Sequence, residues 1–220
     1  MASPVDLAIR DGVATLTLDD GKANALSLPM AQAIEAGLDG AAGARVVVIR
    51  GRPGVLCGGF DLKVIRGGSA EDRAAMTSAG YRLLARLYLL PQPLVFACTG
   101  HAVAAGGLLL LTGDVRIGVH GAFRIGLNET AIGLSLPQIG LELARDRIAP
   151  AALSEATLRA RLYDPDAAAA AGYLDSVADA DGLDAAVAEV AAELLTLDGA
   201  AYAATKRRLR QAAMERAELG

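Results

Sequence analysis

The sequence predicts an α/β fold followed by a helical C-terminal region. Short apolar and β-branched runs recur along the first part of the chain, and segments with helical periodicity separate them. Glycine-rich turns follow several of these runs, and from residue 181 onward the pattern is helical with a break near 198–199. We therefore expect a core over residues 1–160 that carries the functional site, and a helical region over residues 161–220 that belongs to the same functional domain.

The first elements have clear local signals. Strands are expected at residues 5–9 and 13–18, and Asp11-Gly12 between them predicts a hairpin turn. Ser27 is a good N-cap for the helix that follows. The other expected elements, in chain order, are a strand at 45–50, a loop at 51–59, a helical turn at 61–65, a helix at 71–90, a strand at 94–98, a turn at 99–101, a helix from about Gly106, strands at 115–119 and 122–125, and a helical turn at 128–132.

Composition narrows the class of protein. The 220 residues are 53% hydrophobic and 21% charged, which is typical of a globular chain, and the net charge of −4 argues against a nucleic-acid partner. The longest nearly apolar run, at 102–111, is too short to cross a bilayer, and residues 1–6 carry no signal segment, so no membrane association is expected. Cys57 and Cys98 form neither a disulfide framework nor part of a metal-ligand cluster. These features favour a cytoplasmic protein without a metal.

Two glycine-rich turns are candidates for binding negative charge. Residues 56–62 and 99–107 each follow a buried strand and precede a helix. Small residues let the backbone approach a ligand closely, and free N–H groups at a helix start attract negative charge. Two such turns together could hold a developing oxyanion, although each turn alone is more often structural.

Glu129 is the candidate for proton transfer. It is the only carboxylate between Asp114 and Glu142, and its neighbours are mostly apolar. Such surroundings disfavour the charged form and raise the pKa of a carboxyl group toward the range useful for catalysis. The alternative is that Glu129 only favours the first turn of a helix, and without other information that explanation is preferred.

These segments, in this order, resemble the crotonase superfamily, which contains the enoyl-CoA hydratases and isomerases. Residues 56–63 are similar to the family's F-A-A-G-A-D-[IL]-K segment, and residues 99–107 to its N-G-x-A-x-G-G-G segment. Asp114 falls on the Asp of the family's C-D-[IYV]-R-[IV] stretch. The resemblance covers nearly the whole chain. It implies a crotonase (ClpP-like) spiral of ββα units with a helical C-terminal trimerisation region, hence a homotrimer or a hexamer of two trimers.

The resemblance also implies catalytic roles. Gly58 and Ala105 would supply the two N–H groups of an oxyanion hole, and Glu129 would be the catalytic glutamate. Leu108 falls where the hydratases have a second glutamate, and it can neither exchange a proton nor orient water. Residues 126–133 look most like the Δ3,Δ2-enoyl-CoA isomerase branch. The implied substrate is an acyl-CoA thioester, with no cofactor beyond the coenzyme A of the substrate. The alternatives are a hydratase-like lyase and a non-catalytic acyl-CoA-binding crotonase.

Further residues are implied to contact the substrate. For the three lysines among them, a solvated surface charge is an equally good explanation, and His101 is more simply a packed turn residue. Asp61 is also a good N-cap for the helix after the first turn. The implied substrate-binding set is Lys22, Ala23, Ala25, Leu26, Gly59, Phe60, Asp61, Lys63, His101, Leu108 and Lys206.

Overall fold

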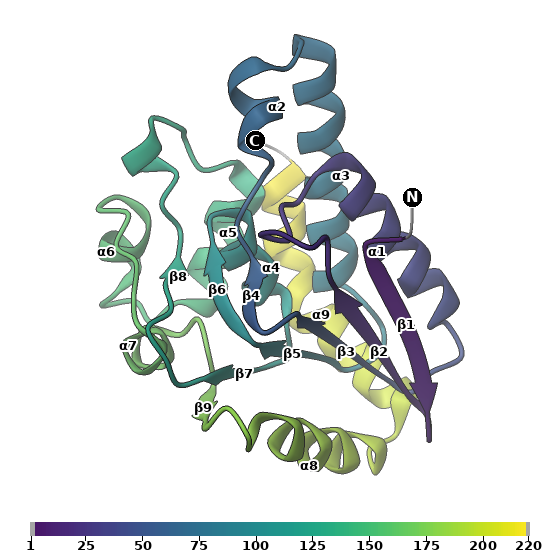
Figure 1. Cartoon of the computed structure of the whole chain (residues 1–220). Helices are drawn as coiled ribbons and strands as arrows, with labels where there is room; N and C mark the ends of the chain where they lie inside the picture. The colour runs from purple at the N-terminus through teal and green to yellow at the C-terminus, as the bar shows by residue number, and fades with distance from the viewer. Residues whose placement is uncertain (1–2, 219–220) are drawn as a thin grey trace.

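The computed structural model describes residues 3–218 and contains two β-sheets flanked by helices (Figure 1). The chain begins with β1 (Val5–Arg10) and β2 (Val13–Leu18), an antiparallel hairpin. Asp11 and Gly12 between them have φ of 49° and 82°, as the turn signal predicts. α1 (Leu28–Gly40) follows, and the Ser27 hydroxyl accepts a hydrogen bond from the Met30 N–H at 3.3 Å, which confirms the predicted cap.

Three consecutive strand pairs build the two sheets. They are β3 (Val46–Gly51) with β4 (Gly54–Cys57), β5 (Leu94–Cys98) with β6 (Gly100–Val103), and β7 (Val115–Val119) with β8 (Ile125–Gly126). The first strand of each pair joins a six-stranded sheet of order β1-β2-β3-β5-β7-β9, and the second joins a three-stranded sheet of order β4-β6-β8. Each repeat therefore moves the chain one strand sideways in both sheets, which confirms the expected spiral of ββα units.

Two strands of the three-stranded sheet, β4 and β6, lie where the sequence predicted a loop and a turn, and β8 begins at the end of the strand expected at 122–125. The strands of this sheet are short and glycine-rich, so they lack the alternating pattern that identifies a strand. Glycine is needed here because the backbones approach closely: a Cβ on Gly100 would overlap the backbone of Gly54, and a Cβ on Gly106 would overlap that of Cys57. The expectation of a loop at 51–59 and a turn at 99–101 was therefore wrong.

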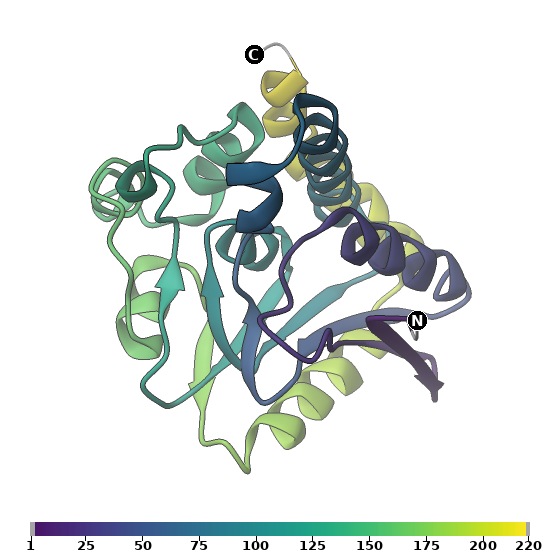
Figure 2. The ribbon, with the colours of Figure 1, turned by 45° about the horizontal axis from the view of Figure 1, so that its top comes forward.

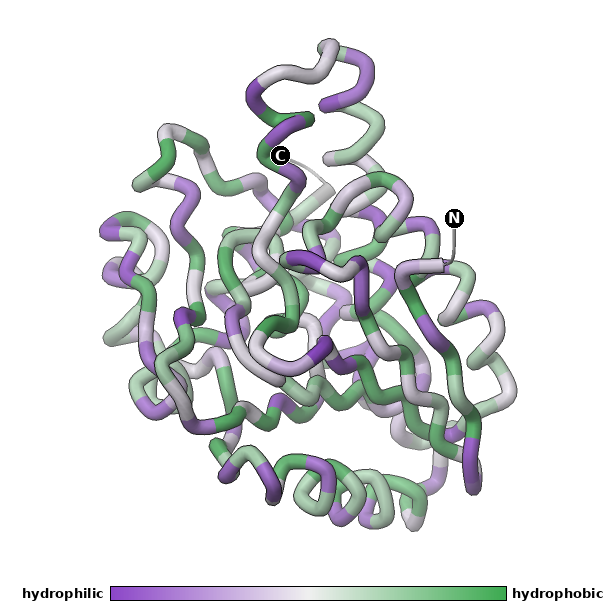
Figure 3. Tube along the Cα trace, in the orientation of Figure 1, coloured by the Kyte–Doolittle hydropathy of each residue, from purple (hydrophilic) through white to green (hydrophobic). Residues whose placement is uncertain are grey.

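Helices cover both faces of the six-stranded sheet. The elements between the strands are α2 (Leu62–Gly67), α3 (Ala70–Tyr88), the fully buried α4 (Ala105–Thr112), the 3-10 turn η1 (Thr130–Ile132), α5 (Gln138–Arg147), α6 (Leu153–Thr157) and α7 (Pro165–Ala171). The main core lies between the sheet and α1, α3, α4 and α5. On the opposite face, α8 (Leu183–Leu195) packs on Val46, Val48 and Val95, and Figure 3 shows that it alternates hydrophobic and hydrophilic residues.

The C-terminal region is not helical throughout. Its strand β9 (Ser176–Ala178) extends the six-stranded sheet beside β7. α9 (Gly199–Glu218) then returns across the molecule and lies beside α3 and α5 (Figure 2). Among residues 3–218, none of the helices has the length and apolar character that a membrane span would need.

Candidate functional site

The two glycine-rich turns touch each other. Parallel pairing of β4 with β6 places residues 56–62 beside residues 99–107. The contact is at Gly59, whose φ is +100°. A Cβ on Gly59 would lie 3.0 Å from the Ala104 Cβ, 3.1 Å from the Val103 carbonyl oxygen and 3.7 Å from the Ala105 nitrogen. Glycine at this position thus allows the two backbones to lie side by side, with no side chain of the first turn between them.

Several backbone N–H groups at this contact, including that of Gly59, have no acceptor among residues 3–218, and two of them are candidate oxyanion donors. One belongs to Phe60 in the first turn and the other to Ala105, the first residue of α4. Ala104, just before the helix, has a φ of 53°, which is strained for a residue with a side chain, and its own N–H donates to the Gly126 carbonyl at 2.9 Å. This strained backbone sets the start of α4, whose helix dipole favours negative charge at Ala105.

The Gly58 assignment needs correction. Its N–H donates to the Ala23 carbonyl oxygen at 2.8 Å and is therefore not free to hold an oxyanion. The N–H of Phe60, two residues later, has no acceptor among the described residues and replaces that of Gly58 as the candidate donor. No sequence signal separates these N–H groups, because the partner of Gly58 comes from a distant loop. The N–H of Ala105 has no acceptor among the described residues, so Ala105 remains a candidate donor.

The predicted segment at 22–26 runs alongside the first turn. Leu26 is fully buried and donates its N–H to the Gly59 carbonyl at 2.8 Å, and Ala25 precedes it. Asn24 holds this loop: its amide nitrogen donates to the carbonyls of Leu18 at 2.9 Å and Leu56 at 3.2 Å. Asn24 is buried with a φ of 49°, and sequence analysis missed its positioning role. Ala23 and Lys22, before it, are exposed beside the turn.

The end of the first turn is fixed to the neighbouring helices. The Asp61 carboxylate accepts a hydrogen bond from the Lys63 N–H at 2.9 Å, which confirms that it caps α2. Lys63 itself is exposed. The Phe60 ring packs edge-on against Tyr81 of α3, with 5.9 Å between ring centroids. A Cβ on Gly80 would lie 2.5 Å from the same ring, so the ring packs against α3 at a position where only glycine leaves enough space.

Glu129 is a buried carboxylate without a hydrogen-bond partner for one of its oxygens. The residue is 8% exposed, and no group among residues 3–218 bonds its Oε2 atom. Desolvation raises the pKa of Glu129, and the backbone N–H groups of Glu129 and Asn128 offset only part of this effect. Tyr81 lies close enough that the Glu129 charge adds to desolvation in raising the pKa of its phenol. Tyr81 therefore packs against Phe60 and is also within the electrostatic influence of Glu129.

Leu108, the position at which the hydratases are implied to have a second acid, is a buried core residue. Leu108 is 1% exposed and packs in the core, 3.2 Å from the position of a Cβ on Gly140. The next carboxylate along the chain, Glu142, is engaged in ion pairs away from Glu129. Glu142 is fully buried and pairs with Arg145 at 2.6 Å and Arg216 at 2.7 Å. Burial alone would raise the pKa of Glu142, but the two arginines lower it.

The enoyl-CoA hydratase/isomerase family model matches residues 8–219 of this sequence. The chain belongs to that family. An enoyl-CoA hydratase/isomerase family protein from Pseudomonas syringae has a similar structure, with a TM-score of 0.95, 42% sequence identity, and 98% of this chain and 94% of that chain covered. An enoyl-CoA isomerase from Mycobacterium tuberculosis superposes with a TM-score of 0.94 at 37% identity, covering 100% and 96%. The mitochondrial enoyl-CoA delta isomerase 1 of Rattus norvegicus is 30% identical over 168 residues, which are 76% of this chain and 58% of the rat protein. This chain therefore spans less than two thirds of that relative.

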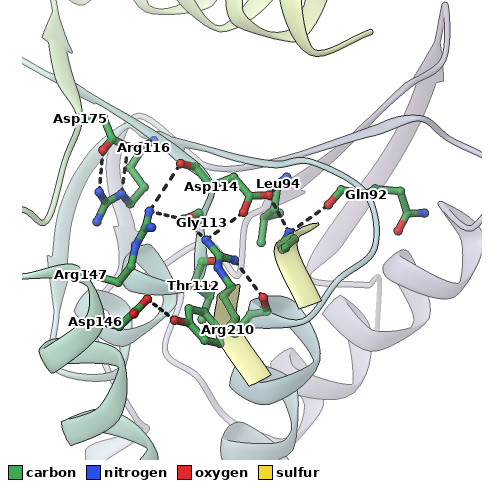
Figure 4. A network of polar contacts seen from close by, with 12 residues as sticks. Gln92, Leu94, Thr112, Gly113, Asp114, Arg116, Asp146, Arg147, Asp175 and Arg210 are labelled. Atoms are coloured by element: carbon green, nitrogen blue, oxygen red, sulfur yellow. Dashed lines mark hydrogen bonds and ion pairs between the residues drawn. The ribbon is translucent and has the colours of Figure 1, made fainter. Parts of the chain in front are cut away.

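Within this enoyl-CoA hydratase/isomerase family member, Lys206 does not lie on a binding surface. Its ammonium is buried and pairs with Asp114 at 2.6 Å and with the Gln92 carbonyl at 3.1 Å. Arg210 completes the cluster at 2.9 Å from Asp114, and Figure 4 shows this network between α9 and the start of β7. Burial lowers the pKa of Lys206 to about 8, although the Asp114 charge opposes the shift. The predicted contact of Lys206 with substrate phosphates was therefore wrong.

Cys57 and His101 have structural contacts. Burial raises the pKa of the Cys57 thiol to about 11, which disfavours a thiolate at neutral pH. The His101 Nδ1 accepts a hydrogen bond from the Arg124 N–H at 3.0 Å. Its ring packs edge-on against Phe123 with 5.4 Å between centroids. These contacts anchor the second turn, and a substrate contact of His101 stays a prediction.

Replacing Gly59 with alanine should lower turnover of an enoyl-CoA substrate by about 10²-fold, the loss expected for one oxyanion donor. The added methyl would push against Ala104 and Val103 and separate the Phe60 and Ala105 N–H groups. Gly54→Ala is the matched control, because Gly54 also has a positive φ, +87°, but open space around its Cβ. Both variants should lose stability in thermal melting, and equal turnover in the two would contradict the role given to the Gly59 contact.

Proposed function

We propose that this chain converts a 3-enoyl-CoA into the conjugated 2-enoyl-CoA by moving one proton with Glu129. The buried Glu129 carboxylate, whose Oε2 atom has no hydrogen-bond partner among residues 3–218, supports the proposal most directly. A raised pKa favours a carboxyl group that both accepts and returns a proton. The apolar Leu108, where the hydratases are implied to have a second glutamate, favours isomerisation over the addition of water. The Phe60 and Ala105 N–H groups are the proposed oxyanion donors.

The proposed reaction has two proton transfers. The Glu129 carboxylate takes a proton from C2, and the electron pair moves toward the thioester oxygen to form a dienolate. The N–H groups of Phe60 and Ala105 stabilise the negative charge on that oxygen. The Glu129 carboxylic acid then protonates C4, which moves the double bond to C2–C3 and restores the carboxylate. A single carboxylate base and an oxyanion hole suffice for a similar shift in ketosteroid isomerase.

An absorbance assay with two substrates tests the proposed function. With 3-hexenoyl-CoA, we expect absorbance to rise as the conjugated thioester forms. With 2-hexenoyl-CoA, we expect no loss of that absorbance, because hydration needs an oriented water. Rapid loss with 2-hexenoyl-CoA would instead identify a hydratase-like lyase. Saturable acyl-CoA binding without change in either substrate would identify a non-catalytic binder. Assembly into a trimer, or into a hexamer of two trimers, stays a prediction.

A further inference from the structure

The turn that carries Glu129 is held mostly by its own backbone. Residues 130–135 are all exposed, so packing does little to fix them. The Glu129 carbonyl oxygen accepts hydrogen bonds from the Ile132 N–H at 3.0 Å and the Leu134 N–H at 2.9 Å, both within the turn. The backbone N–H groups of Glu129 and Asn128 also interact with the carboxylate, and they offset part of the rise in pKa that desolvation causes. The position of the carboxylate therefore depends on where this backbone is anchored.

A side-chain hydrogen bond anchors the turn to α6. The Thr130 hydroxyl donates to the Thr157 carbonyl oxygen at 3.0 Å. Within the described part of the chain, residues 3–218, it is the one hydrogen bond that joins residues 127–136 to another segment. Thr157 ends α6, and the carbonyl groups in the last turn of a helix have no partner within that helix. The Thr130 hydroxyl therefore satisfies an acceptor that α6 leaves open.

The anchoring segment is itself fixed to the strand that leads to Glu129. Thr157 is 6% exposed, so the acceptor is in a packed part of the molecule. Tyr163, shortly after α6, exchanges two backbone hydrogen bonds of 2.9 Å with Ile125 of β8. Figure 1 shows α6 next to β8 at one side of the molecule. The same segment thus holds the chain before Glu129, at Ile125, and directly after it, at Thr130.

We propose that Thr130 is a positioning residue for the reaction: its hydrogen bond to the Thr157 carbonyl fixes the turn that aims the Glu129 carboxylate at C2 and C4. The inference rests on the proposed function. One carboxylate must reach both carbons while the oxyanion donors hold the thioester, so its place relative to those donors matters. A misplacement of about 1 Å can lower turnover by about 10²-fold. Thr130 is assigned no contact with the reacting atoms and acts through Glu129.

Two variants at residue 130 separate the hydroxyl group from the size of the side chain. Thr130→Val keeps the shape and removes the donor. It should lower kcat for 3-hexenoyl-CoA by about tenfold and change the Kd of hexanoyl-CoA by less than about twofold. Thr130→Ser keeps the donor and should restore kcat to within about threefold of wild type. Equal kcat in Thr130→Val and wild type, or equal losses in the two variants, would overturn the proposal.

Thr196→Val is the matched control. Thr196 is also exposed and donates its hydroxyl to a backbone carbonyl, that of Glu193 at 2.7 Å, but it follows α8 on the opposite face of the six-stranded sheet. The control should keep the wild-type kcat. The stoichiometry of hexanoyl-CoA titration gives the fraction of folded sites in each preparation, so that kcat refers to active sites. The same loss of kcat in Thr196→Val and Thr130→Val would overturn the assignment.

The pH profile of kcat/KM gives a readout that a merely structural role would not move. Desolvation raises the pKa of Glu129, and a loosened turn lets water reach the carboxylate. The acidic limb should therefore move to lower pH in Thr130→Val and return in Thr130→Ser. Desolvation also raises the pKa of the phenols that the Glu129 charge acts on, Tyr81 and Tyr173, so neither titrates in this range. A limb that stays in place or moves to higher pH would overturn the positioning role.

Failure of this inference is distinguishable from failure of the proposed function. Absence of isomerisation of 3-hexenoyl-CoA by the wild-type protein would overturn the proposed function and the role of Thr130 with it. Isomerisation by the wild type together with an unchanged kcat in Thr130→Val would overturn the role of Thr130 alone and leave the isomerase in place.

Discussion

Glu129→Gln should lower kcat for 3-hexenoyl-CoA by about 10²–10⁴-fold, the range that a positioned acid–base group contributes. The amide keeps the size of the side chain but cannot accept the C2 proton. Saturated acyl-CoA binding is the internal control and should change little, because the proposed thioester donors are the N–H groups of Phe60 and Ala105. Steady-state kinetics and titration on the same preparation check both parts. Wild-type kcat in the variant would refute the assignment of Glu129.

The pH dependence of the same pair of proteins gives an independent check. Desolvation raises the pKa of Glu129, so kcat/KM should fall on the acidic side at a pH above the ordinary value for glutamate. The raised pKa of Glu129 also makes the free energy of unfolding depend on pH. Between the unfolded and folded pKa values the folded chain binds more protons, so the Glu129 contribution to stability is full at low pH and is lost as pH rises through the folded pKa.

Glu129→Gln should therefore melt at a higher temperature than wild type at pH 8, with the gap closing at acid pH. Each kcal/mol of relief corresponds to about 2–4 °C in a chain of this size. Thermal melting at a series of pH values measures the gap. A gap of the opposite sign would mean that the Glu129 carboxylate is stabilised in the folded chain.

Asp114→Asn should lower the free energy of unfolding by about 3–5 kcal/mol, the cost of breaking a buried charge pair. The substitution removes the carboxylate that pairs with the ammonium of Lys206 and the guanidinium of Arg210. Both charges then stay buried without a counter-charge, because their side chains are at most 5% exposed. The Leu94 N–H, which donates to Asp114 at 2.7 Å, can still find an acceptor in the asparagine. A fall in melting temperature of about 6–20 °C is expected.

Asp184→Asn is the matched control for this effect. Asp184 pairs with Arg50 at 2.9 Å, but its side chain is 73% exposed. Exposed pairs contribute at most about 1 kcal/mol, so the control should melt close to wild type. Equal losses in the two variants would show that the Asp114 cluster does not hold α9 in place.

Strands β1, β2, β3, β5 and β7 of the first sheet and helix α1 could be predicted because their signals are local, whereas β9 was not expected. Asp11-Gly12 and Ser27 specify a turn and a cap through their own backbone and side-chain chemistry. Strands β4 and β6 of the three-stranded sheet could not be predicted, because they are stabilised by close contact between distant glycine backbones and have no apolar alternation. Strand β8 overlaps the strand expected at 122–125 only at Ile125.

The burial of Glu129 could be predicted from the sequence, whereas several contacts of the candidate site could not. The apolar neighbours of Glu129 along the chain correctly indicated a buried carboxylate with a raised pKa. By contrast, the hydrogen bond of Gly58 to Ala23 and the ion pair of Lys206 with Asp114 join segments far apart in sequence. A motif specifies residue types at a turn, whereas only the folded chain determines which N–H or charge already has a partner.

The most direct test of the central claim is mass spectrometry of the product formed from 3-hexenoyl-CoA by the wild-type protein. Proton transfer by Glu129 without an oriented water predicts a product of unchanged mass that absorbs as the conjugated 2-hexenoyl-CoA. A product heavier by one water molecule would show that a water is activated in spite of Leu108, and would contradict the single-carboxylate isomerase.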